Sequence, residues 1–361
     1  MKRISLPVLI LLTFIFTQCS TTKDSTAQFI KAKEVKNIIL MIGDGMGVTQ
    51  VYAGITANKG LNLEKSKYVG LSKTYSANNY ITDSAAGGTA ISTGKKTNNG
   101  AIGVDKEGNE IKTILEYAAE NGLSTGVIAT SSVTHATPAS FVAHQPKRSM
   151  EEEIAVDFLN SDITLFIGGG RKYFADRSDK ANLLDGLVKK GFKVAQDIDA
   201  IKNTTSGKLA GIVTDEHLLT YPERGEFLTE STQAALNILD NNTKGFFLMI
   251  EGSQIDWEGH DNDAEGVVNE VIDFDKAIKV AFDYADRNPG TLVIVTADHE
   301  TGGMALTGGD ITTGEVKASW GRTGHTSVMV PVFSYGIGAE FFTGVYENTD
   351  IFNKLMDLYD F

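Results

Sequence analysis

The hydrophobic pattern of this chain alternates between short continuous apolar runs and longer segments in which apolar residues recur every three or four positions. Continuous runs bounded by turn residues are typical of strands buried on both faces of a parallel sheet. Seven predicted strands cover residues 37–42, 124–130, 163–167, 211–214, 245–250, 291–296 and 328–335. The clearest predicted helices cover residues 85–92, 110–120, 183–190, 228–239 and 267–287. This alternation predicts an α/β fold, a three-layer α/β/α sandwich with a mostly parallel central sheet, in a single domain over residues 35–361.

The first 34 residues follow a different pattern. Lys2 and Arg3 precede an apolar run at residues 6–16, which is too short for a membrane span and has the proportions of an export signal. The only cysteine, Cys19, resembles the end of a bacterial lipoprotein signal, although Gln18 stands where a small residue is usual. We therefore expect an export signal with a lipobox-like end at residues 1–19 and a polar tether at residues 20–34. Lipidation of Cys19 and ordinary cleavage near Ala27 are the alternatives, and both predict an extracytoplasmic protein: periplasmic, anchored to a membrane or secreted.

Composition narrows the class of partner. A chain of 361 residues, 42% of them hydrophobic, can bury a large core, which excludes a disordered or disulfide-stapled protein. Its 46 acidic residues against 33 basic ones give a net charge of −13, which argues against nucleic-acid binding. An acidic protein that handles anions needs local positive charge, and bound metal ions can supply it.

Acidic and histidine side chains follow three of the predicted strands. Asp44 follows residues 37–42, Glu251 follows residues 245–250, and Asp298-His299 follow residues 291–296. Ligands of open parallel sheets collect at the carboxyl ends of the strands. The sequence therefore favours a metal site at this edge, although a solvated acidic loop and a hydrogen-bonded Asp-His pair are the structural alternatives.

Two further segments carry candidate chemistry. Asp256 and His260 are four residues apart, so on a helix they share a face and suit two ligands of one zinc ion. Ser84 begins a predicted helix of small residues, where it is either a helix cap or a nucleophile. The sequence shows no dedicated base for Ser84, so a metal is the better activator.

Six short motifs in order along the chain resemble the alkaline phosphatases. They are Ile42-Gly43-Asp44-Gly45-Met46-Gly47, Thr82-Asp83-Ser84-Ala85-Ala86, Thr134-His135-Ala136-Thr137-Pro138-Ala139, Glu251-Gly252-Ser253-Gln254-Ile255-Asp256, Thr296-Ala297-Asp298-His299 and Gly324-His325-Thr326. The resemblance implies metal-dependent hydrolysis of small phosphate monoesters through a phosphoserine intermediate on Ser84. It also implies two zinc ions and one magnesium ion per subunit.

The resemblance assigns a role to each matching residue. One zinc ion, which activates Ser84, matches the ligands Asp44, Asp298 and His299. The second zinc ion matches Asp256, His260 and His325, and the magnesium ion matches Asp44, Thr137 and Glu251. Arg148 occupies the position of the arginine that grips the phosphate, and Asp83 that of its orienting neighbour.

This chain departs from some relatives in ways that bear on function. His135 stands where some bacterial members have Asp, which leaves the magnesium affinity in doubt, and Trp257 stands where some have Lys, which predicts weaker retention of product phosphate. Residues 300–324 are too few for the inserted subdomain that some relatives carry there. We therefore expect a more open active-site mouth and leave monomer and homodimer as alternatives.

Other functions compete with this interpretation. A phosphodiesterase of the same superfamily usually presents threonine as the nucleophile, and a sulfatase needs Cys/Ser-x-Pro-x-Arg, which Ser84-Ala85-Ala86-Gly87-Gly88 lacks. A surface lipoprotein that binds metal or phosphate without catalysis is the third alternative. His144 and His217 are expected to lie outside the metal shell, and Gly168-Gly169-Gly170-Arg171 is expected to form a turn rather than a phosphate loop.

Overall fold

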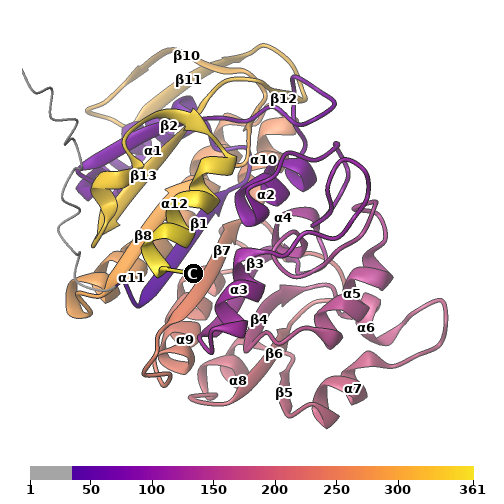
Figure 1. Cartoon of the computed structure of the whole chain (residues 1–361). Coiled ribbons are helices and arrows are strands. Elements are labelled where there is room, and N and C mark those ends of the chain that lie inside the picture. The colour runs from indigo at the N-terminus through magenta and orange to yellow at the C-terminus, as the bar shows by residue number, and fades with distance from the viewer. Residues whose placement is uncertain (1–34) are drawn as a thin grey trace, which may run out of the picture. The chain divides into compact units, whose positions relative to one another are not determined.

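Ten strands form the central sheet of the computed structural model, which describes residues 35–361 (Figure 1). The predicted export signal and tether fall on residues 1–34 and lie outside the described residues. The strands, in their order across the sheet, are β14 (Gly344–Glu347), β2 (Tyr68–Lys73), β13 (Val330–Gly336), β8 (Thr291–Thr296), β1 (Asn37–Gly43), β7 (Phe246–Gly252), β3 (Ser124–Ser132), β4 (Leu165–Gly169), β6 (Lys208–Ile212) and β5 (Phe192–Ala195).

The sheet is mostly parallel, as the sequence predicted. The seven strands from β8 to β5 pair in parallel, and within the sheet only β13 runs against its neighbours β8 and β2. In the register of the central strands, Ile42 of β1 lies opposite Glu251 of β7 and Thr296 of β8. The residues that follow these three strands therefore emerge at the same level of one sheet edge.

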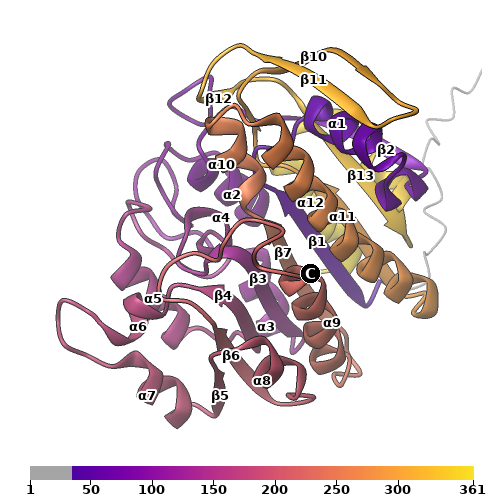
Figure 2. The ribbon, with the colours of Figure 1, turned by 180° about the vertical axis from the view of Figure 1, so that it is seen from behind.

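Helices cover both faces of the sheet, which gives the predicted three layers (Figures 1 and 2). Alternate residues of β1 serve the two cores: Ile39 and Met41 pack into one, and Ile38, Leu40 and Ile42 into the other. The helices of the first face are α1 (Val48–Asn58), α8 (Ile198–Lys202), α9 (Phe227–Leu239) and α11 (Ala264–Arg287). Those of the opposite face are α2 (Ser84–Thr93), α3 (Ile114–Glu120), α5 (Glu151–Asn160), α6 (Arg171–Ala175), α7 (Leu183–Lys189) and α12 (Thr349–Tyr359).

Short elements supplement the three layers. The helices are α4 (Ala136–Ala139), α10 (Gln254–His260), η1 (Asn62–Lys65) and η2 (Ala339–Phe342). Two small antiparallel ribbons pair β9 (Glu300–Thr301) with β12 (His325–Thr326) and β10 (Met304–Asp310) with β11 (Glu315–Trp320). The residues between His299 and His325 thus form a hairpin, which packs against α1. No helix within residues 35–361 is long and apolar enough to cross a membrane.

The structure corrects several predicted boundaries. The helix predicted from residue 110 begins only at Ile114, because Thr113 caps it: Thr113 Oγ1 accepts from Glu116 N at 3.2 Å, and Glu116 accepts from Thr113 N at 2.7 Å. β4 starts and ends two residues later than predicted, and β6 ends at Ile212 instead of residue 214. The predicted elements do not include α1, α5 and α12, or the short strands β2, β5 and β14, of which β5 and β14 lie at the edges of the sheet.

Candidate active site

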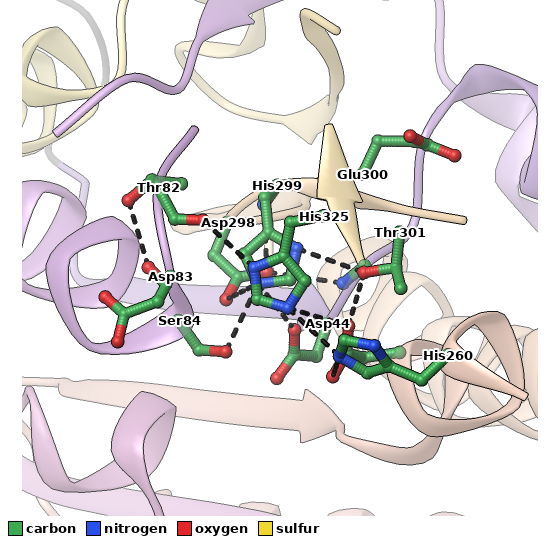
Figure 3. A network of polar contacts seen from close by, with 12 residues as sticks. Asp44, Thr82, Asp83, Ser84, His260, Asp298, His299, Glu300, Thr301 and His325 are labelled. Carbon is green, nitrogen blue, oxygen red and sulfur yellow. Dashed lines mark hydrogen bonds and ion pairs between the residues drawn. The ribbon is translucent and has the colours of Figure 1, made fainter. Parts of the chain in front are cut away.

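The carboxyl ends of three central strands deliver fully buried polar side chains to one place, and Figure 3 shows Asp44, Asp298 and His299 among them. Asp44 follows β1, Glu251 lies at the end of β7, and Asp298 and His299 follow β8. All four side chains are 0% exposed. Burial of so many ionisable groups is costly unless they are paired or bind a cation, so this edge of the sheet is specialised.

A glycine turn after β1 brings Asp44 near the segment that follows β7. Gly45 has φ +72°, and a Cβ there would lie 2.8 Å from Asp256 Cα and 2.7 Å from Thr301 Oγ1. Both the backbone angle and the lack of space require glycine at this position. Because Gly45 has no side chain, the turn after β1 can approach Asp256 and Thr301 closely.

Ser84 is the first residue of α2 and faces the buried cluster. Its Oγ lies 3.2 Å from His299 Nε2, and the preceding Asp83 caps the helix by accepting from Ala86 N at 3.0 Å. The small residues of α2 explain the approach: a Cβ at Gly87 would lie 3.1 Å from Asp298 Cβ. Since Asp83 is the cap, the hydroxyl group of Ser84 is not needed for capping and faces His299 instead.

Asp44, Asp298 and His299 form the first group whose side chains converge as metal ligands do. His299 Nε2 lies 3.3 Å from Asp44 Oδ1 and 3.4 Å from Asp298 Oδ2. Neither of these two buried oxygens has a hydrogen-bond partner among the described residues. Burial, with repulsion from Asp256, raises the pKa of Asp298 to about 6. Burial and neighbouring carboxylates also raise the pKa of Asp44 well above its ordinary value. A divalent cation would satisfy both oxygens and balance their charge.

Asp256, His260 and His325 form the second group. His260 Nδ1 lies 2.5 Å from the Thr323 carbonyl oxygen, and His325 Nδ1 lies 2.9 Å from the Thr82 carbonyl oxygen. A carbonyl oxygen only accepts, so both Nδ1 atoms donate and, in neutral rings, both Nε2 atoms carry lone pairs. These Nε2 atoms are 3.1 Å apart and lie 3.3 Å (His260) and 3.4 Å (His325) from the Asp256 carboxylate oxygens.

The Asp256 carboxylate attracts positive charge to the second group. A hydrogen bond to Asp256 raises the pKa of His260 to about 9, so at neutral pH this ring holds a proton that a bound metal ion would displace. Burial alone would raise the pKa of Asp256, but hydrogen bonds from His260 and His325 outweigh it and hold that pKa well below its ordinary value. Two imidazole nitrogens and a carboxylate, with both Nδ1 atoms held by carbonyl oxygens, are a typical donor set for zinc.

A third group joins Asp44, His135 and Glu251. Thr137 Oγ1 lies 3.4 Å from Asp44 Oδ2, so the predicted ligand Thr137 also faces this group. Glu251 Oε2 accepts from Ser253 Oγ at 2.5 Å, whereas Oε1 is buried without a partner within residues 35–361. Burial raises the pKa of Glu251 to about 7. The oxygen-rich donor set fits a hard ion such as magnesium.

Arg148 lies at the rim of the site between two acceptors. Its guanidinium donates to Asp83 Oδ2 at 3.3 Å and to His135 Nε2 at 3.1 Å. Burial and the positive charge of Arg148 lower the pKa of His135 to about 3, so the ring is neutral. The side chain of Arg148 is 31% exposed, which leaves part of the fork accessible to an anion.

The comparison with known families identifies the chain. The family model described as "Alkaline phosphatase" matches residues 35–319. The chain belongs to the alkaline phosphatase family. Alkaline phosphatase 4 of Bacillus subtilis is 33% identical over 431 aligned residues, which cover 96% of this chain and 93% of the relative. Alkaline phosphatase of Escherichia coli is 30% identical, with 92% and 88% covered.

Solved structures agree with this assignment. The alkaline phosphatase of the Antarctic bacterium TAB5 is 42% identical, covers 91% of this chain and 99% of its own, and superposes with a TM-score of 0.86. A variant of the TAB5 enzyme, with a TM-score of 0.87, has magnesium bound. The prediction of an alkaline phosphatase with an α/β fold is confirmed, and so is the prediction of an enzyme. This alkaline phosphatase is a metal-dependent hydrolase of phosphate monoesters.

All of the site residues predicted from the sequence lie at this edge of the sheet. His144 lies apart: it contacts the Gly103 carbonyl at 2.7 Å and Glu116 at 3.1 Å, as expected for a histidine outside the metal shell. His217 packs its ring against Trp257 at 4.8 Å between centroids and accepts from Ser132 N at 3.0 Å.

Glu300 and Thr301 also lie at the site of this alkaline phosphatase and are not among the residues predicted from the sequence. Thr301 donates its hydroxyl to Asp256 Oδ1 and lies 3.3 Å from His299 Nδ1, so it touches ligand candidates of both groups. The signal available was their position directly after Asp298-His299. A strand continuing from a buried ligand pair carries its next side chains alternately toward and away from the site.

Proposed function

We propose that this alkaline phosphatase transfers the phosphoryl group of a small monoester to Ser84 Oγ and then to water, with two zinc ions and one magnesium ion per subunit. The first two groups above are the proposed zinc sites, and the third is the proposed magnesium site. The observation that carries the proposal is the 3.2 Å approach of Ser84 Oγ to His299 Nε2, beside buried carboxylates that each have one oxygen without a hydrogen-bond partner among the described residues.

When bound, divalent ions at such a pair of sites lower the pKa of a hydroxyl group and balance the charge of the transferring phosphoryl group. The chain supplies the remaining parts. Burial lowers the pKa of His299 well below its ordinary value, so the ring is neutral. Because Thr301 donates its hydroxyl to Asp256 Oδ1, its oxygen accepts from His299 Nδ1, which leaves the lone pair on Nε2. The amino terminus of α2 places backbone N–H groups beside Ser84, where they favour an incoming anion.

Arg148 is proposed to hold the substrate through its phosphate. Asp83 and His135 each accept one N–H of the guanidinium, so the plane of the fork is fixed before substrate arrives. The remaining N–H donors suit two nonbridging oxygens of a phosphoryl group. Because this grip involves only the phosphate, we expect the enzyme to accept many monoesters.

Location and assembly belong to the same proposal. The basic start and apolar run of the first 19 residues support export to an extracytoplasmic compartment, with lipid anchoring or ordinary cleavage as the two routes. Residues 35–361 are proposed to be the single catalytic domain, and the short hairpin between His299 and His325 supports a more open mouth. Monomer and homodimer are both compatible with this catalytic proposal.

A substrate panel tests the reaction class. The purified protein, supplied with zinc and magnesium, is assayed with the monoester, diester and sulfate ester of one chromogenic phenol. We expect monoester turnover to exceed diester and sulfate turnover by about 10³-fold or more, because Arg148 and the two metal groups are placed for a terminal dianionic phosphoryl group. A faster diester reaction would contradict the proposal.

Trp257 offers a test of product retention. Its ring lies 6.0 Å from that of His135, which contacts Arg148, so a cation at position 257 would lie near the phosphate-binding region. Trp257→Lys is expected to lower the inhibition constant of inorganic phosphate by about tenfold. Trp257→Leu, which removes the ring without adding charge, is the control. Equal phosphate inhibition in the lysine and leucine variants would count against the idea.

A further inference from the structure

Glu300 is a buried carboxylate beside the second metal group but outside it. Its side chain is 3% exposed, and within residues 35–361 no lysine, arginine or histidine forms an ion pair with it. A buried carboxylate without a cationic partner is costly unless hydrogen bonds satisfy its lone pairs. Its role must therefore be sought in the groups that donate to it.

Four neutral donors from three segments meet at Glu300. Gln50 Nε2 of α1 donates to Oε1 at 2.7 Å, and Met304 N donates to the same atom at 3.1 Å. Gly303 N donates to Oε2 at 3.2 Å, and the Thr326 hydroxyl group also donates to Oε2. The carboxylate thus ties α1, the turn after β9 and strand β12 to one point.

The ribbon of β9 and β12 carries this constraint to the metal group. Thr326 lies opposite Glu300, and His325 lies opposite Thr301. Opposite residues of an antiparallel pair share a face, and successive residues alternate between faces. Glu300 and Thr326 therefore occupy one face, while Thr301 and His325 occupy the other. Figure 3 shows Glu300 turned away from the cluster and His325 turned into it.

The space around Glu300 allows little adjustment. A Cβ at Gly47 would lie 2.5 Å from Glu300 Cγ, so helix α1 closes directly over the side chain. Gln50 Nε2 also donates to the Thr301 carbonyl oxygen at 2.8 Å, so the same side chain holds both residues of β9. The hydrogen bonds of Glu300 therefore hold one arrangement of the ribbon.

We infer that Glu300 is a positioning residue that holds His325 against Asp256 and His260, and thereby sets the affinity of this group for its divalent ion. The inference rests on the proposed function, since it takes these three residues as a metal site. Glu300 touches none of them directly and acts through Thr326 and the backbone of β12. Outer residues of this kind typically change metal affinity by about 10- to 100-fold when replaced.

The test compares Glu300→Gln with Asp275→Asn. In Glu300→Gln, an NH₂ group replaces one carboxylate oxygen and faces donors. Asp275 of α11 is the matched control, because it is also 3% exposed and accepts hydrogen bonds from backbone N–H groups. Its donors are Asn62 N at 2.8 Å and Leu63 N at 2.9 Å, both of η1, and they do not belong to the metal groups. Metal-free protein is titrated with zinc against a chelating dye, and the melting temperature is recorded in parallel.

We expect Glu300→Gln to weaken the affinity for one zinc ion per subunit by about 10- to 100-fold. Asp275→Asn should lower the melting temperature and leave the zinc affinities within about twofold of wild type. At saturating zinc, kcat of Glu300→Gln should return to within about fivefold of wild type, because the residue does not contact the reacting atoms. Thr326→Val, which removes one donor to Glu300, should weaken the same zinc equivalent and carries the test if Glu300→Gln does not fold.

The outcomes separate the two proposals. If wild-type protein binds no zinc tightly, the proposed function fails. If wild-type protein binds zinc and Glu300→Gln binds it equally well, or Asp275→Asn weakens binding as much, the positioning role alone is overturned. Activity of Glu300→Gln that stays low at saturating zinc also overturns it, because the effect would then not pass through metal affinity.

Discussion

Replacing Ser84 by alanine is expected to lower monoester turnover by about 10³-fold or more while metal binding stays at the wild-type level. The hydroxyl group is the acceptor in the proposed reaction, and without it water must attack the ester directly. Ser84 is buried, at 1% exposure, and its Oγ approaches His299 Nε2 at 3.2 Å. Removing one oxygen leaves the carboxylates and imidazoles of the three groups in place. The measurement is kcat for a monoester, together with the zinc content of the purified variant.

Ser92→Ala is the matched control for this substitution. Ser92 lies on the same helix, is 0% exposed and donates to the Ser140 carbonyl oxygen at 2.6 Å, away from the site. Its loss should cost stability and leave kcat nearly unchanged. Mass spectrometry of quenched turnover mixtures adds a direct readout, since a phosphorylated peptide containing Ser84 should appear only when Ser84 is present. Full turnover by Ser84→Ala would refute the proposed nucleophile.

Asp44→Asn is expected to lower kcat/KM by about 10³-fold or more and to release metal from two groups at once. Asp44 belongs both to the group with Asp298 and His299 and to the group with His135 and Glu251. The amide replaces a charged ligand oxygen by an NH₂ group, which cannot bind a cation. The loss of several kcal/mol of charge stabilisation in the transition state corresponds to a factor of this size.

Metal analysis and add-back decide how Asp44→Asn acts. Treatment of wild-type protein with a chelator should reproduce the loss of activity, and zinc with magnesium should restore wild-type activity but only part of the variant's. Asp275→Asn, a buried amide substitution remote from the site, should retain both metal and turnover. Normal metal content and normal kcat/KM in Asp44→Asn would show that this carboxylate does not serve the two groups.

The site was predictable from the sequence because its ligand candidates lie where strands end. Asp44, Glu251 and Asp298 each follow a continuous apolar run, and parallel strands place such positions at one edge. The resemblance to the family then supplied the specific residues, including Arg148, which lies outside the six motifs and which the sequence alone would have left as a solvated charge. The predicted start of a helix at residue 110 was wrong, because the capping interaction of Thr113, rather than the spacing of apolar residues, sets where that helix begins.

The sequence by itself determined the layered α/β architecture, the family and the residues at the strand ends. The spacing of hydrophobic residues and the short motifs both depend only on residues that are close together along the chain. Only the tertiary structure decided which further side chains support them: the contact of His135 with Arg148, and the meeting of Gln50, Glu300 and Thr326. The residues in each set are not neighbours along the chain, so no periodic pattern links them. Their contacts depend on strand register, on the close approach that glycines allow, and on the direction in which each side chain leaves its strand or helix.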